Sequence, residues 1–466
     1  MKYWGVALTF AAFISVNAEA NMSSLFNQLL KSVQNSHSIK NEQAEPDGGD
    51  GDQAGGSNDG SDNSSDGSNN SNNGSNNSAD SGYSECMESV AGSYDTRCML
   101  TALADEVIIP SYAKLATEAR EFSDEDGALA TYCAAISSAD EAQAFNTAET
   151  GWKGLVRAVQ RAEMHAIGPA TDNGKTLQYR LNSYMSGPIS TCGIDSIAAS
   201  DNVDVASRSL NARGIRALDY LLFNSDLTHT CAPQVSATAG WNELPESDRK
   251  IARCNAALAI AGDISDAAEK IHSAWSATEG NYRATYLEPS NTFQSLQATT
   301  DSLFYLEKGT KDAKLGKPLG IIAACTNRTC PDSVEAPYSG MSLQNVITNI
   351  EIFTEMFSSN AETGFDAHLE SEGWPEVSQA FKTNLAEAKK LAESIDSSVA
   401  SQVASIQTES DETECTNAFS NPDTVSESLP MCTLYGLVKR VVDSLKIDFV
   451  TIVNVDIPGG SQSDND

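Results

Sequence analysis

The sequence predicts an all-α protein in which two antiparallel helical bundles pack together. Apolar residues recur at spacings of three and four over residues 251–275, 343–357 and 434–445, as they do along the buried faces of bundle helices. The alternation that is typical of strands is scarce, and residues 447–457 are the main segment that shows it. Helices without partner strands pack most simply as bundles, and residues 83–466 form a stretch long enough for two or three domains.

The first 20 residues have the pattern of a secretory signal peptide. Lys2 supplies a positive charge, residues 6–16 are an apolar run, and residues 18–20 form the Ala-Glu-Ala cleavage pattern. The apolar run is too short to span a bilayer. The first cysteine is Cys86, so there is no lipobox cysteine beside the cleavage pattern. We therefore expect an exported, periplasmic and soluble protein without an integral membrane segment after cleavage.

Residues 21–82 are predicted to form a disordered arm. From residue 41 to residue 82 the chain is rich in Asp, Gly, Ser and Asn, and it carries nine acidic residues and no Lys or Arg. Such a segment has too little apolar surface to form a core. We place the N-terminal bundle in residues 83–240, the C-terminal bundle in residues 241–455 and a tail in residues 456–466.

The charge of the chain argues against nucleic acid as a partner. The 64 acidic residues outnumber the 30 basic ones, which gives a formal net charge of −34. A protein that binds nucleic acid needs clustered Lys and Arg to contact phosphates.

The ten cysteines favour disulfides, because their number is even and they follow an export signal. Their connectivity cannot be deduced from the sequence. The pair Cys325 and Cys330 is the best local candidate, and 86 with 98 or 415 with 432 would also close short loops. The alternative is a metal cluster, but no C-x-x-C pair is present.

Three stretches carry a family resemblance. They are residues 103–112, where Pro110 should interrupt an amphipathic helix, residues 214–223, and residues 311–318 followed by 335–342. With Ile167-Gly-Pro between them, their order and spacing resemble the imelysin family of exported bacterial proteins over residues 98–446. The resemblance implies two packed helical-bundle domains with a site near their junction, and an association with iron uptake. It also implies a metallopeptidase motif, G-x-H-x-x-E.

The chain departs from that motif at its two chemically active positions. Gly214 is kept, but Arg216 replaces the His and Asp219 replaces the Glu. A guanidinium is not a practical metal ligand, since it stays protonated. We therefore assign no catalytic residue, no metal ligand and no cofactor, although the resemblance implies iron or another divalent metal. Arg216 and Asp219 suit an ion pair on one helix face, either as a structural salt bridge or as a grip for an anion.

Four further residues are weaker candidates for ligand binding. Arg208 and Arg213 precede Arg216 on what we expect to be one helix, where they would bind a small anion or neutralise nearby carboxylates. Glu335 and Ser339 belong to the last motif, and Ser339 or Ser342 would also serve as the N-cap of the following helix.

Three functions are consistent with these patterns. The first is an exported binding protein that assists iron acquisition, with a small anionic ligand or an iron-uptake component as its partner. The second is a diverged metal-dependent peptidase. The third is a protein-interaction scaffold at the cell surface.

Overall fold

The computed structural model describes residues 94–200, 203–359 and 363–462, and these belong to one compact unit. The predicted signal peptide, the acidic arm and Cys86 lie outside the described residues. The fold is all-α, as predicted, and no β-strand occurs in the part of the chain that is described. Its α-helices are α3 (Thr96–Ala102), α4 (Ile109–Ser123), α5 (Ala128–Ala135), α6 (Glu141–Met164), α7 (Asp172–Leu181), α8 (Thr191–Ala198), α9 (Gly214–Phe223), α10 (Glu246–Trp275), α11 (Tyr282–Tyr286), α12 (Thr292–Leu303), α13 (Ser342–Ser358), α14 (Phe365–Ser371), α15 (Pro375–Ser394), α16 (Val399–Ser405), α17 (Glu409–Ser420), α18 (Pro430–Ser444) and α19 (Val450–Val453).

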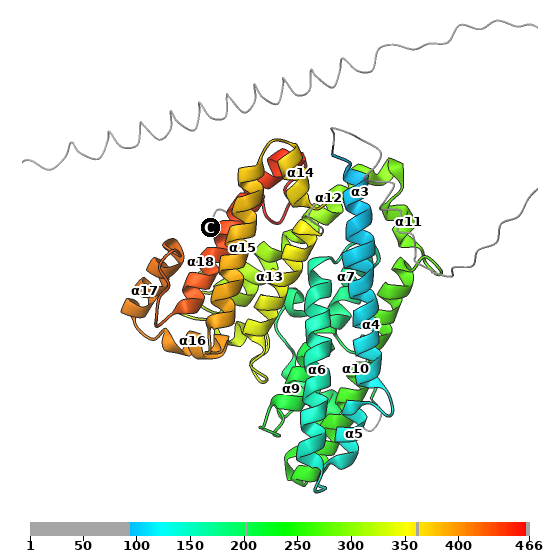
Figure 1. Ribbon diagram of the computed structural model, residues 1–466. Coiled ribbons are helices and arrows are strands. Elements are labelled where there is room, and N and C mark those ends of the chain that lie inside the picture. Colours follow the sequence, from blue (N-terminus) through cyan, green and yellow to red (C-terminus); the bar gives the residue numbers. More distant parts are fainter. Residues whose placement is uncertain (1–93, 201–202, 360–362, 463–466) are drawn as a thin grey trace, which may run out of the picture. The chain divides into compact units, whose positions relative to one another are not determined.

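Three long helices, α4, α6 and α10, form the centre of one group (Figure 1). Helix α4 packs against both α6 and α10, and the shorter helices α5, α7 and α9 complete the group. The periodic residues of α6, Trp152, Leu155 and Val159, are buried in this core as their spacing predicts. Helix α10 begins at Glu246, just after the predicted domain boundary, yet it packs mainly on helices that precede that boundary. The division of the chain at residue 240 stays a prediction.

A second group is centred on α13, α15 and α18 (Figure 1). Helix α15 packs on α13 and α18, and α14 and α17 lie against α15 and α18 respectively. Helix α13 also packs against α6, so that α6 and α13 join the two groups. The stripe from Leu343 to Phe357 in α13 is buried, in agreement with its helical spacing.

Three π-helical segments interrupt the α-helical pattern: η1 (Leu103–Ile108), η8 (Leu306–Gly316) and η10 (Leu445–Phe449). Segment η1 ends just before Pro110, which lacks an N–H, and it confirms that the helix is irregular there. The strand-like pattern at residues 447–457 is misleading, because the chain stays helical as far as Val453. Phe449 explains this, since its ring is fully buried among the phenylalanines of the second group.

Four disulfides link described residues, and two of them join helices, α5 to α10 and α17 to α18. Cys325–Cys330 and Cys415–Cys432 confirm two of the short loops that the sequence suggests. The other two pairs, which the sequence left open, are Cys133–Cys254 and Cys192–Cys231. Cys98 is disulfide-bonded as well, and the suggested partner, at position 86, lies outside the described residues.

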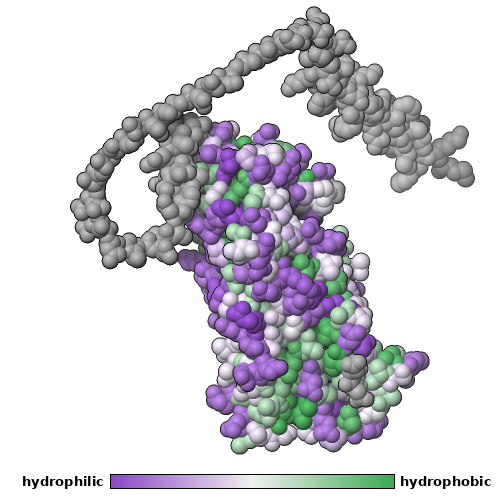
Figure 2. Space-filling model, turned by 90° about the vertical axis from the view of Figure 1, so that its right-hand side faces the viewer, coloured by the Kyte–Doolittle hydropathy of each residue, from purple (hydrophilic) through white to green (hydrophobic). Residues whose placement is uncertain are grey.

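The face of the fold drawn in Figure 2 is mainly polar. Figure 2 shows hydrophilic residues over most of one face, with hydrophobic residues gathered toward its lower end. Within residues 94–200, 203–359 and 363–462, no helix is both long and apolar enough to cross a membrane.

Candidate functional site

The predicted motif occupies the start of helix α9, and Gly214 is the residue that allows this start. Its backbone lies in the left-handed region, with φ of +75°. A Cβ atom at this position would lie 2.6 Å from the carbonyl oxygen of Leu181. Glycine tolerates both the conformation and the close approach, whereas any L side chain would be strained. The motif glycine therefore fixes how α9 leaves the preceding loop.

Arg216 is a buried cation on α9. Its side chain donates one hydrogen bond of 3.0 Å, from Nη1 to the Gly187 carbonyl oxygen, and its Cζ lies 5.0 Å from the ring centroid of Tyr184. Arg216 is 5% exposed, and its Nε is buried without a hydrogen-bond partner. Burial lowers the pKa of the guanidinium, although nearby groups including Glu335 and Asp219 raise it.

Asp219 contacts a loop instead of Arg216. Its carboxylate accepts hydrogen bonds from the backbone N–H groups of Tyr338, at 3.3 Å, and Ser339, at 3.1 Å. Burial raises the pKa of Asp219 to about 6, and the hydrogen bonds from Ser339 and Tyr338 oppose this rise. The predicted ion pair is wrong, because among the described residues no salt bridge joins the two motif side chains. Asp219 instead positions the turn of residues 336–340.

The three arginines do not share a helix, contrary to our expectation. Arg213 precedes α9 and forms an ion pair with Asp263, with an Nη2–Oδ1 distance of 2.6 Å. Arg208 lies in the loop before it, and its carbonyl oxygen accepts a weak hydrogen bond from Arg213. Arg213 therefore neutralises a carboxylate, which is the alternative that the sequence left open. Within the described residues, neither Arg208 nor Arg216 has a carboxylate at ion-pair distance, and of the two only Arg216 is buried.

In the last motif, residues 335–342, Ser339 belongs to a turn and Glu335 to a buried polar network. The N-cap prediction for α13 is wrong, because the cap residue is Met341 and it makes no side-chain capping bond. Ser339 lies in the turn that Asp219 holds. Glu335 is buried, at 2% exposure, and accepts hydrogen bonds from the amide groups of Gln160, Asn182 and Asn345.

Glu335 belongs to a buried polar network that the motif search did not reveal. Lys314, from η8, lies 3.4 Å from a Glu335 oxygen and 3.2 Å from a Glu163 oxygen. Burial would raise the pKa of Glu335, but Lys314 and the amide donors outweigh it and lower that pKa. Burial raises the pKa of Glu163 in spite of the same ammonium. Lys314 lies within residues 311–318, one of the stretches that carry the family resemblance. That position was the sequence signal that could have pointed to this network.

A short segment connects this network to Arg216. Asn182 donates to Glu335 through its side-chain amide and accepts the backbone N–H of Tyr184 through its side-chain oxygen. The Tyr184 ring then packs against the Arg216 guanidinium. Tyr184 also donates from its hydroxyl to the carbonyl oxygens of Ala313 and Ser333. The structure thus brings Arg216, Asp219 and Glu335 into one region.

The residues of this region do not fit a metal ion. The motif position that a metal would need carries the Arg216 cation, and Glu335 is already bonded to an ammonium and three amides. Within the described residues, no group of three or more His, Cys, Asp or Glu side chains is arranged to hold a metal.

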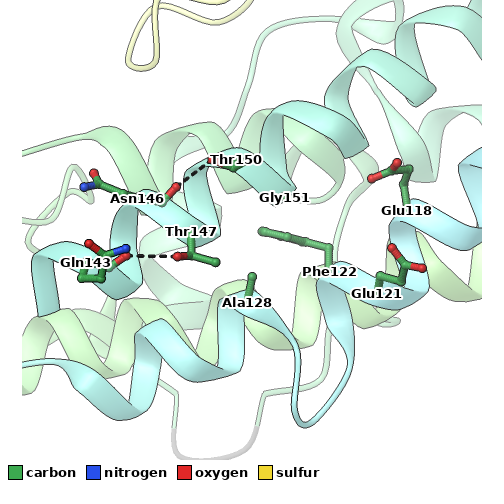
Figure 3. Close-up of a pocket in the computed structure, with 9 residues that line it drawn as sticks. All are labelled: Glu118, Glu121, Phe122, Ala128, Gln143, Asn146, Thr147, Thr150 and Gly151. Carbon is green, nitrogen blue, oxygen red and sulfur yellow. Dashed lines mark hydrogen bonds between the residues drawn. The ribbon is translucent and has the colours of Figure 1, made fainter. Parts of the chain in front are cut away.

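A separate pocket of about 490 Å³ lies between α4, α5 and α6 (Figure 3). Phe122, Ala128 and Gly151 form its apolar part, while Glu118 and Glu121 lie on one side. On the other side are Gln143, Asn146, Thr147 and Thr150. The two threonines donate to backbone carbonyls of their own helix, so their hydroxyls are already bonded. None of the motif residues lines this pocket.

The family model for imelysin matches residues 108–423, which is most of the chain. The chain belongs to the imelysin family. No curated protein matches the sequence. The imelysin fold is also seen in the crystal structure of an imelysin-like protein from Psychrobacter arcticum, which has 17% sequence identity and a TM-score of 0.57. That match covers 79% of this chain and 99% of the other.

A second solved structure has the same fold. It is a protein from Parabacteroides distasonis described as a candidate iron-regulated protein A precursor, with 13% identity and a TM-score of 0.51. The match covers 77% of this chain and 97% of that protein. At these identities the likeness concerns the imelysin fold alone.

Proposed function

We propose that this imelysin-family protein is an exported binding protein that holds a small anionic ligand at Arg216 and assists iron acquisition. The observation that carries the proposal is a buried guanidinium without a carboxylate partner. Arg216 is only 5% exposed, and its buried Nε has no hydrogen-bond partner. Buried charges are normally paired, so an unpaired one is a reason to expect a ligand.

The surroundings of Arg216 support a carboxylate as the ligand group. The guanidinium already uses Nη1 on the Gly187 carbonyl and stacks on Tyr184, which leaves Nε and Nη2 for the fork-shaped contact that arginine makes with carboxylates. The loop of residues 336–340, which Asp219 holds through backbone hydrogen bonds, is the segment that we propose moves to admit the ligand.

Export and iron acquisition rest on different observations. Disulfides persist in oxidising compartments, and four of them link described residues. The signal-peptide pattern in residues 1–20 points the same way. The iron role follows the family resemblance and the description of the Parabacteroides protein as iron-regulated. A ferric carboxylate complex would satisfy both the iron role and the arginine.

Calorimetry with citrate, ferric citrate and free ferric ion tests this proposal. We expect wild-type protein to bind citrate or ferric citrate, and Arg216→Met to weaken that binding about 10- to 150-fold, which is the contribution of a charge-assisted hydrogen bond. Arg157→Met is the matched control, since Arg157 is exposed and its ion pair among the described residues is with Glu351. Binding that Arg216→Met leaves unchanged, or no binding of either anion by the wild type, would refute the proposal.

The same protein can be tested against the two other functions. Cleavage of a protein substrate that a chelator abolishes would indicate the diverged peptidase instead. A scaffold would bind a macromolecular partner with the same affinity before and after Arg216→Met.

A further inference from the structure

The pocket between α4, α5 and α6 offers hydrogen-bond acceptors on two opposite sides (Figure 3). On one side are the carboxylates of Glu118 and Glu121, both from α4. On the other side, Thr147 and Thr150 donate their hydroxyl hydrogens to backbone carbonyls of α6, at 3.2 Å and 2.9 Å. A hydroxyl group whose hydrogen is used in this way can only accept further hydrogen bonds. A ligand that spans the pocket therefore needs donor groups at both ends.

Between these two sides the pocket has an apolar floor. The Phe122 ring and the Ala128 methyl group form it, and Gly151 of α6 lies beside them. A Cβ atom at position 151 would lie 3.2 Å from the Phe122 ring and 3.7 Å from the Ala128 methyl group. Glycine destabilises a helix interior, so a glycine here indicates that the space is needed. Gly154, one turn along α6, likewise leaves room for Glu118, because a Cβ atom there would lie 2.6 Å from the carboxylate oxygen Oε2.

The charges around the pocket favour a cation. Neither Lys nor Arg is among the described residues that line it, and the loop after α4 adds three acidic residues, 124–126. Such a concentration of one charge attracts ligands of the opposite charge. Lys114 forms an ion pair with Glu118, at an Nζ–Oε1 distance of 2.5 Å, but this lysine side chain is 65% exposed. Exposed ion pairs contribute little to stability, so a bound cation can take the place of Lys114 beside Glu118.

These features together describe the chemistry of a ligand. Donor groups at both ends, positive charge and an apolar middle are the properties of a linear aliphatic polyamine. The pocket volume of about 490 Å³ lies within the range of small-molecule pockets, about 300–1,000 Å³. We infer that this pocket binds a linear aliphatic polyamine, with one ammonium group beside Glu118 and Glu121 and the methylene chain over Phe122. This site is separate from the proposed anion site at Arg216, which does not line the pocket.

Calorimetry of the full exported chain with spermidine as the probe tests the inference. We expect the wild type to bind spermidine, and to bind n-butylamine, which has a single ammonium group, at least about tenfold more weakly. Glu121→Gln keeps the shape of the side chain and removes its charge, so it should weaken spermidine binding about fivefold. Glu125→Gln removes the same charge from the neighbouring loop, outside the pocket lining, and is the matched control. Equal losses in the two variants, or no saturable binding by the wild type, would overturn the inference.

A second pair of variants tests the shape of the pocket. Gly151→Ala places a methyl group between Phe122 and Ala128, and it should weaken spermidine binding at least about fivefold. Gly262→Ala, in α10, is the matched control, because it brings the same gain in helix propensity and its Cβ atom has open space around it. Circular dichroism melts check that both variants fold, and the two glutamate variants decide the question if Gly151→Ala does not. Equal binding by the two alanine variants would show that only the acidity of the surface holds the amine, and the inference would be wrong.

Discussion

Acid should destabilise this protein through His165, and replacement of this histidine should remove part of the effect. The His165 ring is fully buried, and neither ring nitrogen has a hydrogen-bond partner. It lies edge-on to Tyr112, with ring centroids 4.8 Å apart. Burial, followed by the positive charge of Arg161, lowers the pKa of His165 from 6.5 to about 3.

The pKa difference sets the size of the effect. Between pH 6.5 and about pH 3 the unfolded chain binds a proton at this histidine and the folded chain does not, so the free energy of unfolding falls as the pH falls. Each pH unit in this window costs about 1.4 kcal/mol, which amounts to about 2 kcal/mol between pH 7 and pH 5. The side chain of leucine does not titrate, so His165→Leu should lose this component.

Urea denaturation of both proteins at pH 7, 6 and 5 measures the effect. The change in packing that the substitution causes is the same at each pH, and it cancels when the pH dependences are compared. His272→Leu, at a partly buried histidine, is the matched control for loss of a histidine ring. If wild type and His165→Leu lose stability in parallel from pH 7 to pH 5, then His165 is protonated in the folded state and the reasoning is refuted.

Two further predictions concern covalent and backbone constraints. Removal of the Cys133–Cys254 disulfide by a double serine substitution should lower the free energy of unfolding by about 2–5 kcal/mol. This loss should exceed that from removal of the Cys325–Cys330 disulfide, because the Cys133–Cys254 bond closes a far longer loop. Equal losses in chemical denaturation would contradict this prediction. Gly214→Ala should cost more than about 1 kcal/mol in the same assay, since its Cβ would meet a backbone oxygen at 2.6 Å. Gly174→Ala has a similar positive φ but open space around the Cβ, so a loss as large as that of Gly214→Ala would refute the argument from close approach.

The fold class could be predicted because helical spacing determines which residues are buried. The stripes of α10, α13 and α18 have the periodicity of amphipathic helices, and their apolar residues form the core. The alternation at residues 447–457 failed as a guide, because the packing of Phe449 among other aromatic rings outweighs a weak local pattern. The π-helical turns were equally hidden, except where Pro110 removes a backbone donor.

The candidate site could be located from the sequence, but its contacts could not. The motif identifies Arg216 and Asp219, yet a spacing of three along a helix says nothing about a loop more than 100 residues later in the chain. The turn at Ser339 supplies the backbone N–H groups that donate to the Asp219 carboxylate, in place of the ion pair with Arg216. The buried polar network around Lys314 was missed for the same reason, because Glu163 and Lys314 are brought together by the packing of α6 on the second group of helices.

The geometry gives the two motif side chains separate roles. Arg216 is surrounded by groups that stabilise a positive charge, the Gly187 carbonyl and the face of the Tyr184 ring, so this position suits a guanidinium. Asp219 uses its oxygens to hold the turn at Ser339, which a longer or uncharged side chain would bind differently. Because these contacts do not overlap, loss of the guanidinium should reduce ligand affinity without releasing the turn. Under the proposed function, the positive charge is what the site offers to a ligand, and the carboxylate is what shapes the site around it.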